Sequence, residues 1–102
     1  YNSAIPKFEK LIEINYKPAE NNYYLGDMLF KRKKYDQAIV HFKKSAMLND
    51  KASYMPTLLL NSAISFENTK DKDNAKNFYS TLIELYPNSQ EAKTAKTNLN
   101  KL

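Results

Sequence analysis

The chain has 102 residues, of which 42% are hydrophobic, so its length and composition suit a single folded domain with a modest core. It has no cysteine, which excludes disulfides, thiol catalysis and thiolate metal sites, and no apolar run approaches the ~20 residues of a membrane span. The net charge of +5 comes from lysines spread along the chain with one arginine, Arg32, so we expect no nucleic-acid partner. Because no apolar run is long enough for a membrane span, we also expect no direct membrane insertion.

A repeated pattern predicts helices that come in pairs. The segments YNSAIPKFEKLIEIN, YDQAIVHFKKSAMLN and KDNAKNFYSTLIELYP begin 34 and then 37 residues apart. Each carries an alanine that is followed four residues later by an aromatic ring, and this spacing places the two on one face of a helix. These pairs are Ala4 with Phe8, Ala38 with Phe42, and Ala75 with Tyr79.

Other helices alternate with these, and no segment has the period of a strand. Turns of about three polar residues, at 33–35 and 70–72, make the flanking helices antiparallel neighbours. The sequence therefore predicts an all-α fold of about six antiparallel helices. In chain order they lie near 2–15, 19–32, 36–48, 54–69, 73–85 and 89–101, with predicted N-caps at Asp36, Ser53, Asp73 and Asn88.

Gly26 is the only glycine in the chain, and it falls inside a predicted helix. A glycine there costs roughly 0.5–1 kcal/mol relative to alanine. We therefore expect another helix to approach so closely that no side chain fits. The segment around Ala63 repeats this pattern 37 residues later, with alanine in place of the glycine. In the tetratricopeptide repeat, which this pattern resembles, the small residue of the first helix faces the alanine of the second, so the resemblance implies contacts of Gly26 with Ala38 and of Ala63 with Ala75.

The helix pair with Leu-Gly in its first helix, alanine in its second and an aromatic ring four residues later resembles the tetratricopeptide repeat (TPR). The resemblance implies one TPR domain, 1–102, in which 1–16 is the second helix of a truncated repeat, 19–50 and 54–87 are repeats and 89–102 is a C-terminal capping helix. Asn22 departs from the pattern, since the family usually has a large apolar residue there. The implied packing positions are Ala4, Phe8, Leu25, Gly26, Leu29, Ala38, Phe42, Ala63, Phe66, Ala75, Tyr79 and Pro87.

The ending LYPNSQEAKTAKTNLNKL, together with the 37-residue spacing, is similar to the C-terminal TPR domain of Tol–Pal-associated periplasmic proteins, the YbgF/CpoB family. This resemblance implies a role in coordinating cell division and envelope constriction in the periplasm of a Gram-negative bacterium. It implies TolA as the partner and a link to the peptidoglycan-synthesis machinery. In that family an N-terminal coiled coil precedes the domain. Because the chain begins at Tyr1 rather than Met, we expect it to be a fragment that oligomerises through such a missing coiled coil.

TPR helices stack into a superhelix whose concave wall is built from the first helix of each pair. By this convention the wall would bind a peptide, although any one of its apolar residues could instead pack on a neighbouring helix. Two other roles stay open: a scaffold in an outer-membrane protein assembly lipoprotein, and a self-associating module that forms a weak dimer. The predicted groove residues are Tyr23, Asp27, Phe30, Lys31, Thr57, Leu60, Ile64, Glu67 and Asn68.

The residues offer little to catalysis. His41 is the single histidine, and without cysteine it has no partners for a catalytic dyad, a triad or a metal cluster. We interpret it as a surface or inter-helix residue. The basic run at 31–34 coincides with a helix end and the following turn, where cations meet the negative end of the helix dipole. The sequence thus predicts a non-enzyme without metal or cofactor.

Overall fold

The structure is a computed structural model that describes residues 4–102, where it contains six α-helices and no strand. The all-α fold is as predicted, and every helix begins and ends within two residues of its predicted bounds, except that residues 2 and 3 of the first lie outside the described part. The chain divides into two compact units, unit 1 (Tyr1–Ala52) and unit 2 (Ser53–Leu102). This division falls between the two predicted repeats, whereas the single domain remains a prediction.

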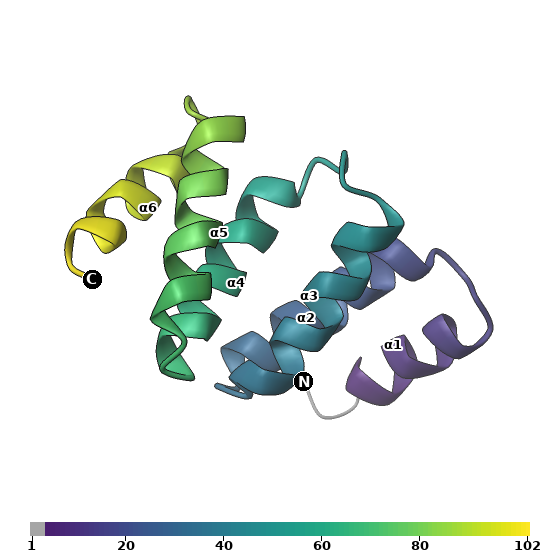
Figure 1. Ribbon diagram of the computed structural model, residues 1–102. Helices are drawn as coiled ribbons and strands as arrows, with labels where there is room; N and C mark the ends of the chain where they lie inside the picture. The colour runs from purple at the N-terminus through teal and green to yellow at the C-terminus, as the bar shows by residue number, and fades with distance from the viewer. Residues whose placement is uncertain (1–3) are drawn as a thin grey trace. The chain divides into compact units, whose positions relative to one another are not determined.

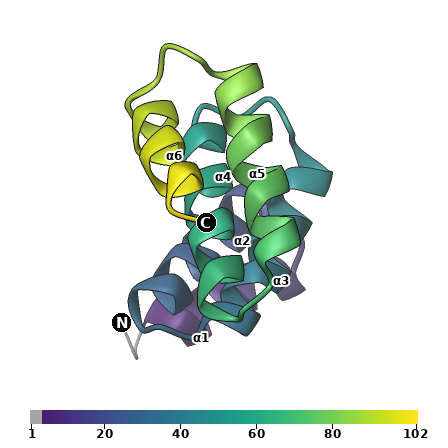
Figure 2. The ribbon, with the colours of Figure 1, turned by 60° about the vertical axis from the view of Figure 1, so that its left-hand side comes forward.

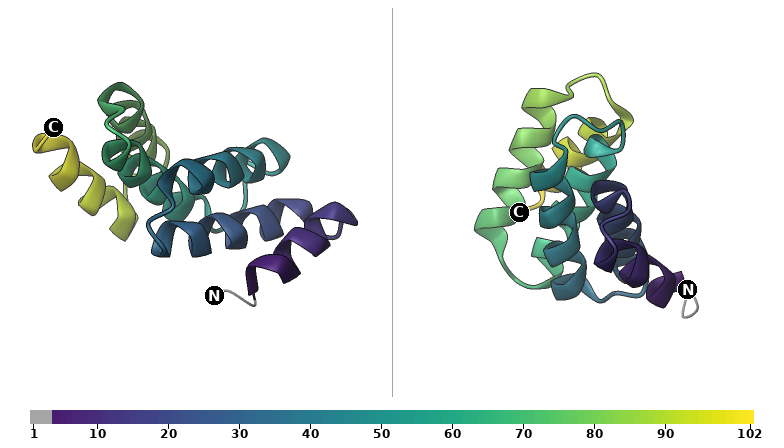
Figure 3. Two further views of the ribbon diagram at one scale, coloured as in Figure 1. Left: turned by 90° about the horizontal axis from the view of Figure 1, so that it is seen from below. Right: turned by 90° about the vertical axis from the view of Figure 1, so that its right-hand side faces the viewer.

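Unit 1 contains α1 (Ala4–Glu13), α2 (Pro18–Lys31) and α3 (Tyr35–Leu48). Helix α2 packs on α3 as an antiparallel hairpin and also contacts α1, so that α2 lies between the other two helices (Figures 1 and 3). The core of this unit consists of side chains from α2 and α3 with less than one-tenth of their surface exposed. They are Leu25, Leu29, Ala38, Ile39 and Phe42.

Gly26 lies at the crossing of α2 and α3, as its position in the sequence predicts. A Cβ atom built on Gly26 would lie 2.8 Å from both Cδ1 and Cε1 of Phe42 and 3.3 Å from the carbonyl oxygen of Ala38. The atoms closest to the missing side chain therefore belong to the Phe42 ring, and the backbone of Ala38 comes next. Since Phe42 has no exposed surface, its ring has little room to move away.

Unit 2 contains α4 (Met55–Asn68), α5 (Lys72–Leu85) and α6 (Gln90–Asn100). Helix α5 packs on α4 and α6, and α6 also contacts α4, so the three helices share one core (Figure 2). Small residues lie where the helices meet, because their short side chains let the backbones approach. The most deeply buried hydrophobic residues are Leu58, Ala63, Ala75, Tyr79, Leu82, Ala92 and Ala95.

Two helices in unit 2 have side-chain caps. Asp71 accepts a hydrogen bond from the backbone N–H of Asn74 (3.2 Å) at the start of α5, and Ser89 accepts one from Ala92 (3.0 Å) at the start of α6. The caps of α3 and α4 are Lys34 and Tyr54, and neither makes a side-chain cap bond. The predicted caps were therefore wrong by one or two residues. Side-chain type did not fix the position, because acidic residues also suit the first turn, which is where Asp36 and Asp73 lie.

The turns of the two helical hairpins use the same motif, with lysine where glycine is usual. Lys33 and Lys70 adopt left-handed backbone conformations, with φ angles of 62° and 64°. In each turn the next residue donates its N–H to a carbonyl five residues back: Lys34 to Leu29 and Asp71 to Phe66, both at 2.8 Å. This pattern is a Schellman C-cap, which satisfies the last carbonyls of the helix. The chain thus keeps its one glycine for a helix crossing.

Gly26→Leu tests the close approach of α2 and α3. The added side chain would collide with the Phe42 ring, so we expect the free energy of unfolding to fall by about 2 kcal/mol or more through overpacking. Urea denaturation followed by circular dichroism would measure the change. Gln37→Leu is the matched control, because Gln37 is exposed on α3 and its replacement should change stability little. Equal denaturation midpoints for Gly26→Leu and the wild type would contradict the close contact.

Lys70→Gly tests the left-handed turn. A side chain at φ 64° is strained, and glycine removes that strain at some cost in unfolded-state entropy, so we expect stability to rise by about 0.5–1 kcal/mol. Lys76→Gly serves as the control, because Lys76 is exposed within α5 and glycine there should destabilise by about 1 kcal/mol. Thermal unfolding would show whether the midpoint temperature rises in Lys70→Gly and falls in Lys76→Gly. A loss of stability at both positions would exclude a strained turn.

Candidate functional site

In unit 1 the predicted groove residues share the outward side of α2. Tyr23, Asp27, Phe30 and Lys31 follow one another at spacings of four, three and one, and they lie about 120–160° around the helix axis from the buried Leu25. Tyr23, Asp27 and Phe30 are half-buried, whereas Lys31 is exposed. Asp27 forms an ion pair with Lys31 across one helical turn, with 3.0 Å between Oδ2 and Nζ.

Aromatic rings from all three helices of unit 1 hold one another in place. The Tyr23 ring lies 5.5 Å from that of Tyr24 and 6.2 Å from that of Phe42, measured between centroids. Tyr24 in turn lies 5.7 Å from Phe8 on α1. Tyr24 was not among the predicted groove residues, but 45% of its surface is exposed and its ring lies beside that of Tyr23.

Phe30 marks the other end of this surface. Its ring meets that of Tyr35, the first residue of α3, edge to face at 5.8 Å between centroids. Tyr35 was not predicted as a site residue, although its position at the end of the short turn could have indicated the contact. Each ring is therefore fixed by a neighbouring ring from another helix. The result is a half-exposed aromatic surface, rather than a set of independent side chains.

In unit 2 the predicted groove residues lie on α4. Leu60 and Ile64 are half-buried apolar residues, and the amide of the exposed Asn68 donates to the carbonyl oxygen of Ile64 at 2.8 Å. Two polar residues of the set contact the neighbouring helices instead of being open to a ligand. The hydroxyl of Thr57 donates to Oε2 of Glu91 on α6 at 2.8 Å, and Glu67 accepts a hydrogen bond from the hydroxyl of Tyr79 on α5.

Tyr79 joins the three helices of unit 2. Its hydroxyl donates to Glu67 on α4 and accepts a bond from the side-chain amide of Asn98 on α6 at 3.1 Å. Burial raises the pKa of Tyr79 above its ordinary value of 10.0, and the hydrogen bond to Glu67 raises it further. The hydroxyl therefore stays protonated at physiological pH and acts as a structural donor.

Asn22 and His41 form a polar pair between α2 and α3. Asn22 is 2% exposed, and its Nδ2 donates to the carbonyl oxygen of Pro18 at 2.8 Å. Its Oδ1 therefore points to Nδ1 of His41, 2.9 Å away, and accepts the proton that this nitrogen carries. The residue that departs from the TPR pattern is thus satisfied by the single histidine, and His41 lies between helices as the sequence suggests.

The environment of His41 disfavours its charged form. Burial lowers the pKa of His41 below 6.5, and the positive charge of Lys44 on the same helix lowers it further, while Glu9 on α1 acts in the opposite direction. At neutral pH the imidazole is therefore neutral. Among residues 4–102 no three acidic, histidine or cysteine side chains lie close enough to hold a metal ion.

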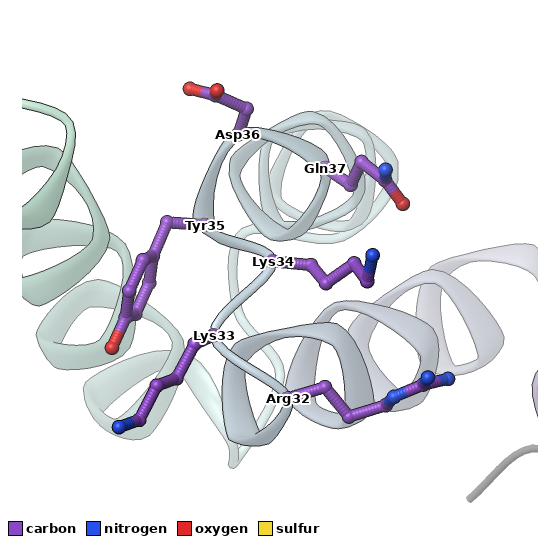
Figure 4. Close-up of a pocket in the computed structure, with 6 residues that line it drawn as sticks. All are labelled: Arg32, Lys33, Lys34, Tyr35, Asp36 and Gln37. Carbon is purple, nitrogen blue, oxygen red and sulfur yellow. The ribbon is translucent and has the colours of Figure 1, made fainter.

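A polar hollow of about 270 Å³ lies at the turn between α2 and α3, where the basic run of the sequence is found. Its cationic side chains do not converge: Lys33 extends to the same side as Tyr35, whereas Arg32 and Lys34 extend to the other (Figure 4). An anion would therefore meet separate cations and not a cradle. No helix within the described part of the chain is both long and apolar enough to cross a membrane.

The twelve packing positions that the TPR resemblance implies differ in how deeply they are buried. Nine of them are buried, Ala4 and Phe8 are half-buried, and Pro87 is exposed after α5. Their placement does not test the functional roles, and the groove also stays a prediction. The nine buried positions are Leu25, Gly26, Leu29, Ala38, Phe42, Ala63, Phe66, Ala75 and Tyr79.

Comparison with known proteins identifies the fold. Residues 57–89 match the sequence model of a tetratricopeptide repeat family. The N-terminal domain of stress-induced protein-1 (STI-1) from C. elegans has a similar structure, with a TM-score of 0.73 over 88% of this chain and 74% of that one. The two are 15% identical, so the likeness shows the fold alone. No curated protein sequence matches the chain significantly. The fold is therefore an all-α TPR fold, as predicted.

His41 gives a prediction about pH. Because its pKa is lowered in the folded state, the unfolded chain binds the proton first as the pH falls through 6.5. We therefore expect the free energy of unfolding to decrease as the pH falls through 6.5, and to level off only at lower pH, where the folded imidazole also binds the proton. Chemical denaturation at a series of pH values would measure this slope. The slope should shrink in His41→Gln, and an unchanged slope in that variant would assign it to other groups.

Proposed function

We propose that the chain is a non-catalytic protein-interaction domain that binds a segment of a partner on the outward face of α2. TPR domains generally bind protein partners, and this chain has the TPR fold. The observation that carries the proposal is the half-exposed aromatic surface around Tyr23 and Phe30, whose rings are fixed by other rings. Leu60 and Ile64 offer an apolar contact on the corresponding face of α4.

Fixed aromatic rings suit this role for an energetic reason. Tyrosine and phenylalanine bury a large area on binding and lose little side-chain entropy, particularly where packing already restricts their rotamers. The Asp27–Lys31 ion pair lies beside the rings, and its Lys31 side chain is 52% exposed. The Asp27 side chain is 22% exposed, and a partly exposed pair one helical turn apart contributes little to stability. On this proposal the pair contributes to the orientation of a bound segment more than to the stability of the fold.

The finer part of the proposal concerns the partner and the compartment. The ending LYPNSQEAKTAKTNLNKL and the 37-residue spacing support a periplasmic, Tol–Pal-associated protein of a Gram-negative bacterium that coordinates cell division and envelope constriction. On this proposal the bound segment comes from a TolA-like protein, with the peptidoglycan-synthesis machinery as a second partner. The alternative is a scaffold role in outer-membrane protein assembly, and the experiment must distinguish it from the Tol–Pal role.

Titration calorimetry of the chain against the periplasmic part of TolA tests both the proposed binding face and the proposed partner. Tyr23→Ala, Phe30→Ala and Leu60→Ala should each weaken binding, by about 2 kcal/mol or more for the buried anchors. Lys33→Ala and Lys34→Ala are the controls, because these exposed turn residues should have small effects that decrease further with salt. Circular dichroism of each variant would show that the fold is retained.

The outcomes separate the alternatives. If the turn lysines matter more than Tyr23 and Phe30, the partner binds an electrostatic patch and the α2 face is not the site. If the wild type does not bind TolA, the Tol–Pal assignment is wrong. Capture of barrel-assembly proteins would then favour the alternative role, and self-association in light scattering would favour the dimer.

A further inference from the structure

Unit 1 also contains an apolar hollow that is separate from the aromatic surface. Its volume is about 280 Å³, and it lies where the end of α1, the start of α2 and the end of α3 come together. On α2 it is lined by Pro18 and Asn22, which lie about 180° and 140° around the helix axis from Asp27. A segment bound on the outward face of α2 would therefore leave it uncovered. The hollow is lined by Ile12, Asn15, Pro18, Asn22, Lys44, Met47 and Leu48.

Two apolar side chains at the rim of the hollow have unusually large exposed fractions. Met47 is 86% exposed and Leu48 is 55% exposed, and both lie in the last turn of α3. Exposed apolar residues that adjoin a hollow indicate a binding site more strongly than isolated ones do. The volume lies just below the ~300–1,000 Å³ of small-molecule sites, so the hollow suits one or two inserted side chains rather than a whole ligand.

The charge at the hollow selects its occupant. Lys44 is the only charged residue among those that line it. The side chain of Asn22 is already bonded to Pro18 and His41, so the polar side chains that a ligand can reach are the ammonium group of Lys44 and the uncharged amide of the exposed Asn15. Residues 1–52 carry ten lysines and arginines against six acidic residues, which also favours an anionic group. Glu9 lies near His41 but does not line the hollow.

The size of the surface argues against a second copy of the chain as the occupant. A stable protein interface takes about 20–30 residues from each side, whereas seven residues line this hollow. We propose that the hollow binds a short segment of a partner protein that presents an apolar side chain next to a carboxylate. The apolar side chain enters between Ile12 and Leu48, and the carboxylate pairs with Lys44. This site does not depend on the function proposed for the α2 face.

Nuclear magnetic resonance titration with two blocked tetrapeptides tests the proposal. The probes are acetyl-Glu-Leu-Phe-Glu-amide and acetyl-Lys-Leu-Phe-Lys-amide, which share their apolar residues and differ in charge. We expect the acidic probe to shift the amide resonances of residues 12–22 and 44–48. It should bind about two- to fivefold more tightly than the basic probe, as one exposed ion pair allows.

Three variants make the test specific. Lys44→Glu should reverse the preference, so that the basic probe binds more tightly. Lys43→Glu is the matched control, because it makes the same charge change on the neighbouring residue, which does not line the hollow, and should leave the preference in place. Met47→Ala should weaken both probes, and its 86% exposure means that the fold should tolerate the change.

Several results would overturn the proposal. These are no shift at residues 12–22 and 44–48 with either probe, equal affinity for both probes, or shifts confined to the Tyr23 and Phe30 surface. A concentration-dependent shift of the same amides without any probe would assign the hollow to a second copy of the chain. None of these results affects whether TolA binds through α2, so the two proposals can fail independently.

Discussion

The close approach of neighbouring helices, permitted by a missing or very short side chain where they meet, is the constraint on which the rest of the structure depends. In unit 1 the Phe42 ring occupies the space that a side chain on Gly26 would take. In unit 2 alanines without exposed surface lie between the helices, among them Ala63, Ala75 and Ala92. Larger residues at these positions would separate the backbones and remove the dense contact that supplies most of the stability of a small α-helical unit.

The position of the candidate binding surface follows from this packing. Because Gly26 lets Phe42 reach α2, the Phe42 ring also supports Tyr23, and Tyr23 in turn contacts Tyr24. The face that we propose for partner binding is therefore held by the core directly beneath it. A change at the crossing of α2 and α3 would alter both the stability of the hairpin and the geometry of the aromatic surface.

Polar side chains supply a second set of constraints that fix which helices meet. Asn22 and His41 join α2 to α3, and Tyr79 joins α4, α5 and α6 through Glu67 and Asn98. Such contacts contribute little net free energy, yet a buried polar group without its partner is costly, so they disfavour other arrangements of the same helices. This explains how the chain can have a buried asparagine where an apolar residue is usual in the repeat.

The sequence alone determined the number, order and pairing of the helices and the place of the close contact, because these depend on periodicity and on residues such as Gly26 whose cost must have a local reason. The tertiary structure decided which of the predicted groove residues are open to a ligand. Thr57 is hydrogen-bonded to Glu91, 34 residues further along the chain, and Glu67 is hydrogen-bonded to Tyr79, 12 residues further along. The apolar hollow beside Lys44 likewise forms where three helices converge. Helical periodicity assigns each side chain to a face of its own helix, but only the packed structure determines what lies opposite that face.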